Sequence, residues 1–353
     1  MNSIKLFNNV IIDNLVKNKR FLFKRKSYIP KFARLGKTFK EQGKVRAQLL
    51  KNEDITVPPI MILSITNDCN LNCAGCYACA QNRIKEDELT IEEIDSVVTE
   101  AIEIGVAIVM IAGGEPLIKK GILDVFKKYE DMLFVMFTNG LMIKGEILDK
   151  LKATKNTISV ISLEGSKEIT DKRRGEGVFD KVMEAINRLD NNDLLFGTSI
   201  TLTSKNYDEV INQKYLKSIQ NMGTAATFLI EYVPCQGDEE LCLTEVQKDD
   251  LNKKMQIMSN ELDMLLIPLP GNEDKYGGCL AAGRGFLHIS STGSLEACPF
   301  APYSDVNVKH LPLKDALKSK LLKEVRDNHH MLKEGKGGCT LVANKEWVES
   351  ISK

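Results

Sequence analysis

The chain has 353 residues, 43% of them hydrophobic and 27% charged, which suits a globular protein with one large domain and a smaller one. No apolar run reaches the roughly 18 residues of a membrane-spanning helix, and the first residues lack the apolar core and cleavage site of a secretory signal. We therefore expect a cytoplasmic protein, whose nine cysteines serve metal or redox chemistry rather than a disulfide framework.

The net charge of zero conceals a basic amino-terminal arm, residues 1–57. Residues 1–51 contain 14 lysines and arginines but only two acids, so the rest of the chain is acidic. Residues 4–16 place apolar side chains along one helical face, and six cations follow within residues 17–26. This pattern suits a helix lying peripherally on an anionic membrane. The alternative is that the apolar face packs on the folded domain and the cations are solvated. The sequence contains no specific nucleic-acid motif.

From residue 58 onward, apolar strand-like segments alternate with helical ones. The first strand is expected at 60–66, and a helix at 90–105 begins with a capping box of Thr90 and Glu93. Further strands, each separated from the next by a helical stretch, are expected at 106–112, 133–138, 157–163, 195–203 and 227–233. Near-continuous apolar strands separated by helices predict a parallel sheet covered on its outer face. We expect an α/β fold, a partial (β/α)6 TIM-like barrel over residues 58–240, with an open doubly wound sheet as the competing architecture.

The alternation ends near residue 240, and residues 241–353 are expected to form a smaller α+β unit. The pattern predicts a long helix over 243–265 and a hairpin over 286–298 with its turn at 291–294. Helices around 313–328 and 344–352 are expected to close the chain.

The loop after the first strand gathers Cys69, Cys73 and Cys76 in C-x3-C-x2-C spacing, with Cys79 shortly after. Three such thiolates can hold three corners of a [4Fe–4S] cube and leave one iron open. A zinc site would use four ligands, commonly two C-x2-C pairs, and only Cys76 and Cys79 form one. Cys79 could close the cluster and make the loop an electron carrier. We expect instead an open cluster, with Cys79 as a buried apolar filler.

Three more motifs follow the next three strands: GGEP at 113–116, TNG at 138–140 and SLEG at 162–165. Together with the cysteine loop they make residues 58–345 resemble the radical S-adenosylmethionine (SAM) superfamily. Two departures stand out. Gly75 precedes the third cysteine where the family often has an aromatic residue, which leaves the adenine contacts open, and Glu164 replaces the aspartate of many relatives.

The resemblance implies that SAM chelates the open iron through its amino and carboxylate groups. Gly113 and Gly114 would let the backbone approach the ligand closely, and Glu115 would accept a hydrogen bond from its ammonium group. Asn139 and Ser162 would offer contacts to the ribose or the carboxylate. Arg174 is a candidate for the carboxylate, with a surface role as the alternative.

The carboxy-terminal unit contains Cys279 and Cys298 around Gly293 in a C-x13-G-x4-C pattern, and Cys339 follows. This pattern resembles the auxiliary-cluster region called SPASM or its shortened form, twitch. Twitch matches better because the further cysteines of SPASM are absent. The resemblance implies an auxiliary [4Fe–4S] cluster held by these three cysteines. The fourth ligand stays open between Cys235, Cys242 and a substrate or other non-cysteine group, and the alternative is three unrelated core cysteines.

These features predict a radical SAM enzyme that uses an external flavodoxin- or ferredoxin-like electron donor. Such an enzyme cleaves SAM reductively to a 5′-deoxyadenosyl radical, which abstracts a hydrogen from a substrate. Glu231, at the end of the sixth predicted strand, is a candidate for substrate contact or proton transfer. A lipid or lipid-linked substrate would suit a membrane-bound arm, and a peptide is the other class considered. The competing function is a non-catalytic iron–sulfur carrier or sensor, which has no use for GGEP.

Overall fold

The computed structural model describes residue 22 and residues 25–80, 86–234, 237–270, 277–332, 335, 337 and 339–352. Within these residues nine strands form one sheet, in the order β7-β6-β5-β4-β3-β2-β1-β8-β9. Neighbours from β7 to β8 run parallel, and β9 runs antiparallel to β8. The strands are β1 (Ile60–Ser64), β2 (Ile108–Ala112), β3 (Leu133–Thr138), β4 (Thr157–Ser162), β5 (Phe196–Leu202), β6 (Ala226–Glu231), β7 (Leu265–Leu269), β8 (Phe286–Ile289) and β9 (Leu295–Glu296).

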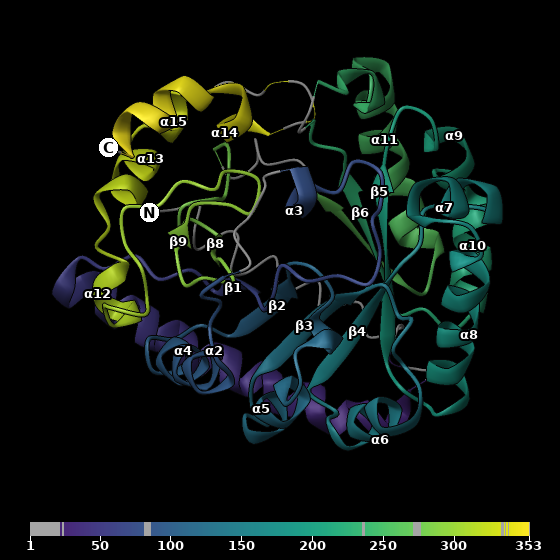
Figure 1. The fold of residues 1–353 in the computed structure, drawn as a ribbon, viewed down its shortest axis with the longest axis horizontal. Coiled ribbons are helices and arrows are strands. Elements are labelled where there is room, and N and C mark those ends of the chain that lie inside the picture. The colour runs from purple at the N-terminus through teal and green to yellow at the C-terminus, as the bar shows by residue number, and fades with distance from the viewer. Residues whose placement is uncertain are drawn as a thin grey trace.

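Helices surround the outer side of this curved sheet, which forms the predicted partial barrel (Figure 1). Every strand expected up to residue 240 is present, with bounds that differ by at most two residues. The helices are α2 (Ile29–Glu53), α3 (Tyr77–Ala80), α4 (Ile91–Glu103), α5 (Ile122–Lys128), α6 (Gly145–Ala153), α7 (Lys167–Arg174), α8 (Val178–Asn191), α9 (Tyr207–Val210), α10 (Gln213–Asn221), α11 (Glu245–Glu261), α12 (Leu313–Ala316), α13 (Lys320–Asp327), α14 (Thr340–Ala343) and α15 (Lys345–Ile351).

The main hydrophobic core lies between the sheet and its outer helices. Alternate strand residues, such as Leu63 in β1 and Ile111 in β2, point into it and are fully buried. Helix α4 contributes Ile94 from its apolar stripe. The predicted capping box at Thr90 is confirmed, because both of its hydrogen bonds form. Each such buried aliphatic side chain stabilises the fold by about 1.5–3 kcal/mol, and together they fix the outer helices on the sheet.

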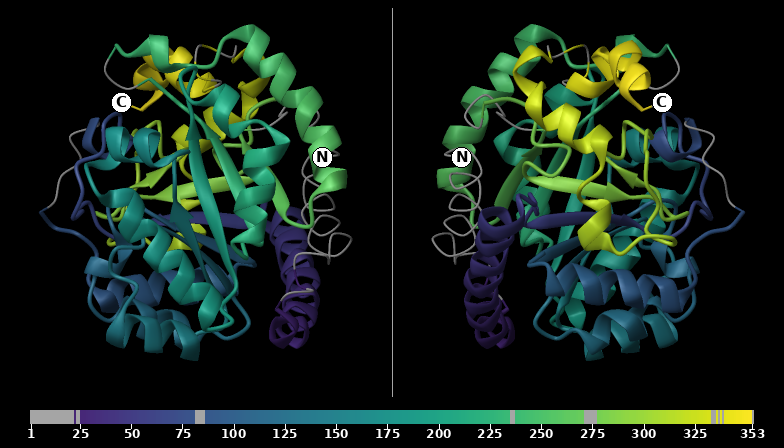
Figure 2. Two further views of the ribbon diagram at one scale, coloured as in Figure 1. Left: turned by 90° about the vertical axis from the view of Figure 1, so that its right-hand side faces the viewer. Right: turned by 90° about the vertical axis from the view of Figure 1, so that its left-hand side faces the viewer.

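A second core lies on the concave side of the sheet. The opposite set of strand residues, including Ile108, Val160 and Phe228, points into it, and Leu35 and Phe39 of α2 pack against them. Arg46 of α2 donates to the carbonyl oxygen of Gly105, which precedes β2. Helix α2 therefore covers the amino-terminal ends of the strands. Figure 2 shows α2 (purple) and the segment after β1 (dark blue) on opposite sides of the molecule.

The described part of the basic arm includes α2, which packs on the domain. The apolar stretch 4–16 and most of the cations within 17–26 lie outside the described residues. Among the described helices, none combines the length and apolar character needed to span a membrane.

The carboxy-terminal region extends the same sheet at both edges. The helix expected over 243–265 ends at Glu261, and β7 forms a seventh parallel strand beside β6. The predicted hairpin is present as β8 and β9, and β8 pairs with β1. The five apolar residues of β7 directly follow Met264, so the sequence pattern of this strand could not be separated from that of the preceding helix. Strands from both sides of the domain boundary predicted at residue 240 share one sheet, so this boundary stays a prediction.

Candidate active site

The cysteine loop leaves the carboxyl end of β1, where a barrel of this type places its active site. Cys69 is exposed, and Cys73 and Cys76 are half-buried. Desolvation raises the pKa of the Cys69 thiol, and the nearby Glu115, Cys73 and Cys76 raise it further. The side chain of Cys79 lies outside the described part of the chain.

The GGE segment after β2 lies directly on the backbone of the cysteine loop. Gly114 N donates to Thr66 O at 2.7 Å, and Glu115 N donates to Asp68 O at 2.8 Å. A Cβ atom at Gly114 would stand 2.0 Å from Asp68 O, and one at Gly113, whose φ is +106°, would stand 2.5 Å from Thr66 O. Both glycines were expected to let the backbone approach a ligand. In this structure the close approach is to the cysteine loop, whose path it fixes.

The Glu115 carboxylate joins the second strand to the third. It is 1% exposed and accepts hydrogen bonds from Thr138 Oγ1 at 2.7 Å, Asn139 N at 2.8 Å and Leu117 N at 3.1 Å. Burial raises the pKa of this carboxyl group, and these three donors lower it in part. Glu115 therefore orders the GGE and TNG segments, and its expected contact with an ammonium group stays a prediction.

Asn139 extends this network to the cysteine loop. Its Nδ2 donates to Asn70 Oδ1 at 2.6 Å, and Asn70 lies between the first two cysteines. Its Oδ1 accepts from Leu141 N at 3.0 Å, which fixes the amide orientation. The ends of β1, β2 and β3 are thus tied together by hydrogen bonds around the cysteine loop.

Two further predicted residues lie at strand ends. Ser162 ends β4 on the concave side, two residues after Val160, and Ser199 Oγ lies 3.4 Å from its hydroxyl. Glu231 ends β6. Because strand side chains alternate, Glu231 shares the side of Leu229, which packs in the outer core, and not that of Ile230, which packs in the inner one. This register does not favour the expected substrate contact of Glu231.

Arg174 lies beside the cysteine loop rather than on the surface. Its Nε donates to Glu164 Oε1 at 2.8 Å, and its Nη1 lies 3.9 Å from Cys73 Sγ. Its neighbour Arg173, which the sequence analysis missed, also donates to Glu164, from Nη1 at 2.6 Å. The available signal in the sequence was the pair of adjacent arginines that follows Glu164, which lies just after β4.

Comparison with known proteins supports the same interpretation. Residues 63–212 match the model of the Radical SAM superfamily. The AdoMet-dependent heme synthase of Methanosarcina barkeri (strain Fusaro / DSM 804) is 25% identical over 322 residues, which cover 82% of this chain and 89% of that protein. The chain is a radical SAM enzyme.

Other relatives match the radical SAM enzyme over shorter stretches or in fold alone. The sporulation killing factor maturation protein SkfB of Bacillus subtilis (strain 168) is 31% identical over 161 residues, 44% of this chain and 39% of that protein. The crystal structure of Streptococcus suis SuiB bound to its precursor peptide SuiA has a TM-score of 0.67 at 17% identity, covering 86% of this chain and 77% of that one. These likenesses confirm the partial barrel.

The cysteine loop of this radical SAM enzyme offers three thiolates of the kind that hold a four-iron cube. Among the residues that the structure describes, no three histidine, cysteine or acidic side chains close on one point as a single ion requires. A cube takes one thiolate at each of its separate corners, so its ligands stand apart. Three soft sulfur donors on one short loop, beside a backbone held by two glycines, fit such a group.

The carboxy-terminal cysteines all border the main core, which extends along the whole sheet, but they are not shown to hold a cluster. Cys298 is buried in the main core, and Cys279 and Cys339 pack against it. A Cβ atom at Gly337 would stand 2.6 Å from Tyr232 O and 2.7 Å from Pro234 Cδ, so the segment before Cys339 lies against the one before Cys235. Cys235 itself lies outside the described residues, and Cys242 is buried. The auxiliary cluster stays a prediction.

His288 takes part in a buried polar chain that the sequence did not reveal. Its Nε2 lies 2.8 Å from Ser64 Oγ at the end of β1, and its Nδ1 lies 2.7 Å from Glu296 Oε2 in β9. These three side chains are at most 4% exposed. Such burial excludes a substrate, so Ser64, His288 and Glu296 do not act as a hydrolytic triad. It joins the carboxy-terminal hairpin to the strand that precedes the cysteine loop.

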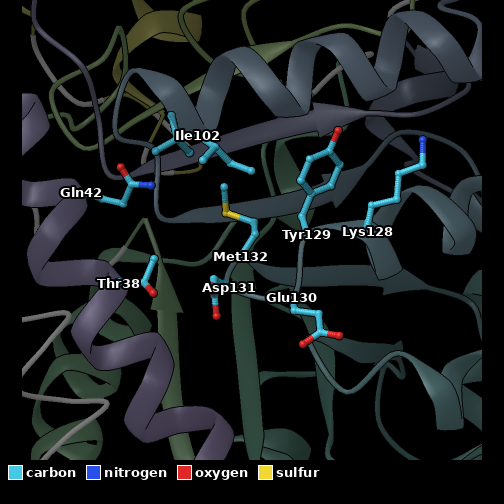
Figure 3. Close-up of a pocket in the computed structure, with 9 residues that line it drawn as sticks. Thr38, Gln42, Ile102, Lys128, Tyr129, Glu130, Asp131 and Met132 are labelled. Atoms are coloured by element: carbon cyan, nitrogen blue, oxygen red, sulfur yellow. The ribbon is translucent and has the colours of Figure 1, made fainter.

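A cavity of about 290 Å³ lies at the other end of the strands (Figure 3). It is lined by residues of α2, by the end of α4 and by the segment that leads into β3, namely Thr38, Gln42, Ile102, Val106 and 128–132. Because the cysteine loop leaves the opposite ends of the strands, this cavity is separate from the radical SAM site.

Proposed function

We propose that Cys69, Cys73 and Cys76 hold a [4Fe–4S] cluster whose open iron binds SAM, and that the enzyme removes a hydrogen atom from an unactivated carbon of its substrate. One observation carries this proposal: the backbones and side chains after β1, β2 and β3 meet around the three cysteines. Gly114 N bonds to Thr66 O at 2.7 Å, and Asn139 Nδ2 bonds to Asn70 Oδ1 at 2.6 Å. A simple electron carrier has no need for this convergence.

When bound, the reduced cluster and SAM supply a 5′-deoxyadenosyl radical. The chain's own residues position these groups and exclude water. Glu115 holds the TNG segment through Asn139 N, and Ser162 offers a hydroxyl on the concave side of the sheet. An external one-electron donor, flavodoxin- or ferredoxin-like, is needed to reduce the cluster.

The concave side of the sheet favours a substrate with an apolar reacting part. Met110, Phe137 and Ile230 line this side and remain partly exposed. Phe137 and Ile230 lie toward the carboxyl ends of their strands, and Met110 lies in the middle of β2. A porphyrin is the first candidate, because the heme synthase matches 82% of this chain. A peptide is the second, because SkfB is 31% identical over 161 residues. A peripheral membrane contact, and with it a lipid substrate, rests on residues 4–26 alone, most of which lie outside the described residues.

The cysteine assignment is tested by SAM cleavage. Anaerobically reconstituted protein, reduced with dithionite and mixed with SAM, should release 5′-deoxyadenosine. Cys69→Ala, Cys73→Ala and Cys76→Ala should each abolish this product, since each removes a cluster ligand. Cys79→Ala should retain most of it. If Cys79→Ala is as inactive as the other three, the loop holds a closed cluster.

We also propose that Cys279, Cys298 and Cys339 hold the auxiliary [4Fe–4S] cluster. Support comes from their C-x13-G-x4-C spacing, with Cys339 following. Reconstituted protein should contain about eight iron atoms, two cubes of four. A variant with alanine at positions 69, 73 and 76 should retain about four irons. If this variant folds but retains no iron, the three carboxy-terminal cysteines do not hold a cluster and only pack in the core.

A further inference from the structure

Two adjacent arginines at the end of α7 connect β4 to the cysteine loop. Arg173 and Arg174, the arginine pair, share one carboxylate, that of Glu164, which is 0% exposed. Glu164 Oε1 accepts from Arg173 Nη1 at 2.6 Å and from Arg174 Nε at 2.8 Å, and Arg174 Nη2 also donates to it. Thr201 N donates to the other carboxylate oxygen at 3.1 Å. Glu164 is therefore held by the sheet and in turn holds both guanidinium groups.

The far side of the arginine pair faces the cluster ligands. Arg173 Nε donates to Ala74 O at 3.2 Å, and Ala74 N donates back to Arg173 O at 2.8 Å. Arg173 Nη2 also lies 3.5 Å from Gly75 O. Arg174 Nη1 approaches Cys73 Sγ at 3.9 Å. The residues between the second and third cysteines are thus attached to α7 by both backbone and side chain.

The arginine pair carries two positive charges against the one negative charge of Glu164, and the buried Glu115 is a further carboxyl group near Arg174. Within the described part of the chain, the arginine pair makes ion pairs with Glu164 alone, and guanidinium groups stay protonated in proteins. The two side chains are only 18% and 11% exposed, so solvent screens their charge weakly.

We propose that Arg174 raises the reduction potential of the cluster held by Cys69, Cys73 and Cys76, and that Arg173 holds the loop that carries it. The proposal rests on the proposed function of this loop. A [4Fe–4S] cluster gains one negative charge when it accepts one electron from the external donor, and net charge near a cluster sets its potential. A buried guanidinium beside a ligand sulfur stabilises the reduced form. This role differs from the expected contact with the SAM carboxylate, since Nε and Nη2 of Arg174 already bind Glu164.

Redox titration followed by electron paramagnetic resonance (EPR) tests the role of Arg174. The signal of this cluster is identified by its change when SAM is added. Arg174→Gln removes the cation and should shift the midpoint potential to a lower value. Glu164→Gln removes the opposing charge and should shift it to a higher value. Lys172→Gln is the matched control, because it removes a cation from the exposed side of the same helix, and it should leave the potential unchanged.

Opposite shifts from Arg174→Gln and Glu164→Gln cannot come from a loosened structure, which would move both variants alike. An unchanged potential in both variants, or an equal shift in Lys172→Gln, would overturn the proposal. If Arg174→Gln assembles no cluster, Arg174→Lys and Glu164→Gln still decide the sign, with Arg174→Lys expected near the wild-type value. Wild-type protein without any SAM-sensitive signal would instead refute the proposed function itself.

Iron loss to a chelator tests the role of Arg173. Arg173→Gln should release iron several-fold faster than the wild type, because both side-chain bonds to the loop are lost. Its midpoint potential should shift less than that of Arg174→Gln, since Arg173 lies farther from the sulfur. Release at the wild-type rate would show that the backbone bond to Ala74 suffices and would remove Arg173 from the proposal.

Discussion

Substitution of Gly114 by alanine tests the claim that the GGE segment fixes the cysteine loop. The added Cβ would stand 2.0 Å from Asp68 O and 2.6 Å from Asp68 C, both backbone atoms that cannot rotate away. The two segments must separate, which breaks the bonds from Gly114 N to Thr66 O and from Glu115 N to Asp68 O. Each lost bond costs about 0.5–1.5 kcal/mol, and overpacking adds about 1–3 kcal/mol.

We therefore expect Gly114→Ala to lower the free energy of unfolding by about 2–6 kcal/mol. Urea denaturation of the iron-free protein, followed by circular dichroism, measures this change. Gly36→Ala is the control: no atom lies within 4 Å of its added Cβ, and alanine in a helix interior should stabilise the protein by about 0.5–1 kcal/mol. A Gly114→Ala protein as stable as the wild type would refute the proposed packing of the two segments.

Two further substitutions probe the surroundings of the site. His288→Leu should lower the free energy of unfolding by about 3 kcal/mol, because it removes the buried partner that Ser64 and Glu296 share. Urea denaturation measures this change, and the exposed His310→Leu is a control expected to stay within about 0.5 kcal/mol of the wild type. A change in His288→Leu no larger than in this control would contradict the buried hydrogen-bonded group. Gly75→Ala should reduce the iron bound per chain, because its φ is +64° and its Cβ would stand 2.7 Å from the Tyr232 hydroxyl. Gly177→Ala, at φ +74° with open space around it, adds the same backbone strain without the collision, so equal iron loss in both would exclude a role for Tyr232.

The barrel was predictable because its signals are local. Strands such as β3, Leu133–Thr138, are short apolar runs with polar breaks, and the observed bounds equal the predicted ones. The capping box at Thr90 depends on two residues three positions apart. The strand β7 was missed because its apolar residues continue directly from a helical pattern. Its identity as a strand comes from pairing with β6, which the local sequence does not encode.

The candidate site was predictable in its residue types and not in its contacts. The cysteine spacing and the family resemblance of the GGE segment pointed to these residues, but not to the close approach of both glycines to the cysteine loop. Arg174 was named for a ligand contact, while its partnership with Arg173 around Glu164 depends on how α7 meets β4. The bond between His288 and Ser64 joins residues 224 positions apart, so no local pattern could reveal it.

The central claim is that three cysteines hold a cluster with an iron open to SAM. The most direct test is the EPR spectrum of the reduced protein before and after SAM is added, in the wild type and in a variant with alanine at positions 279, 298 and 339. The account predicts that SAM changes the spectrum in both proteins, because the open iron gains the amino and carboxylate groups of SAM as ligands. A spectrum of the reduced cluster that SAM leaves unchanged in both proteins would contradict the account.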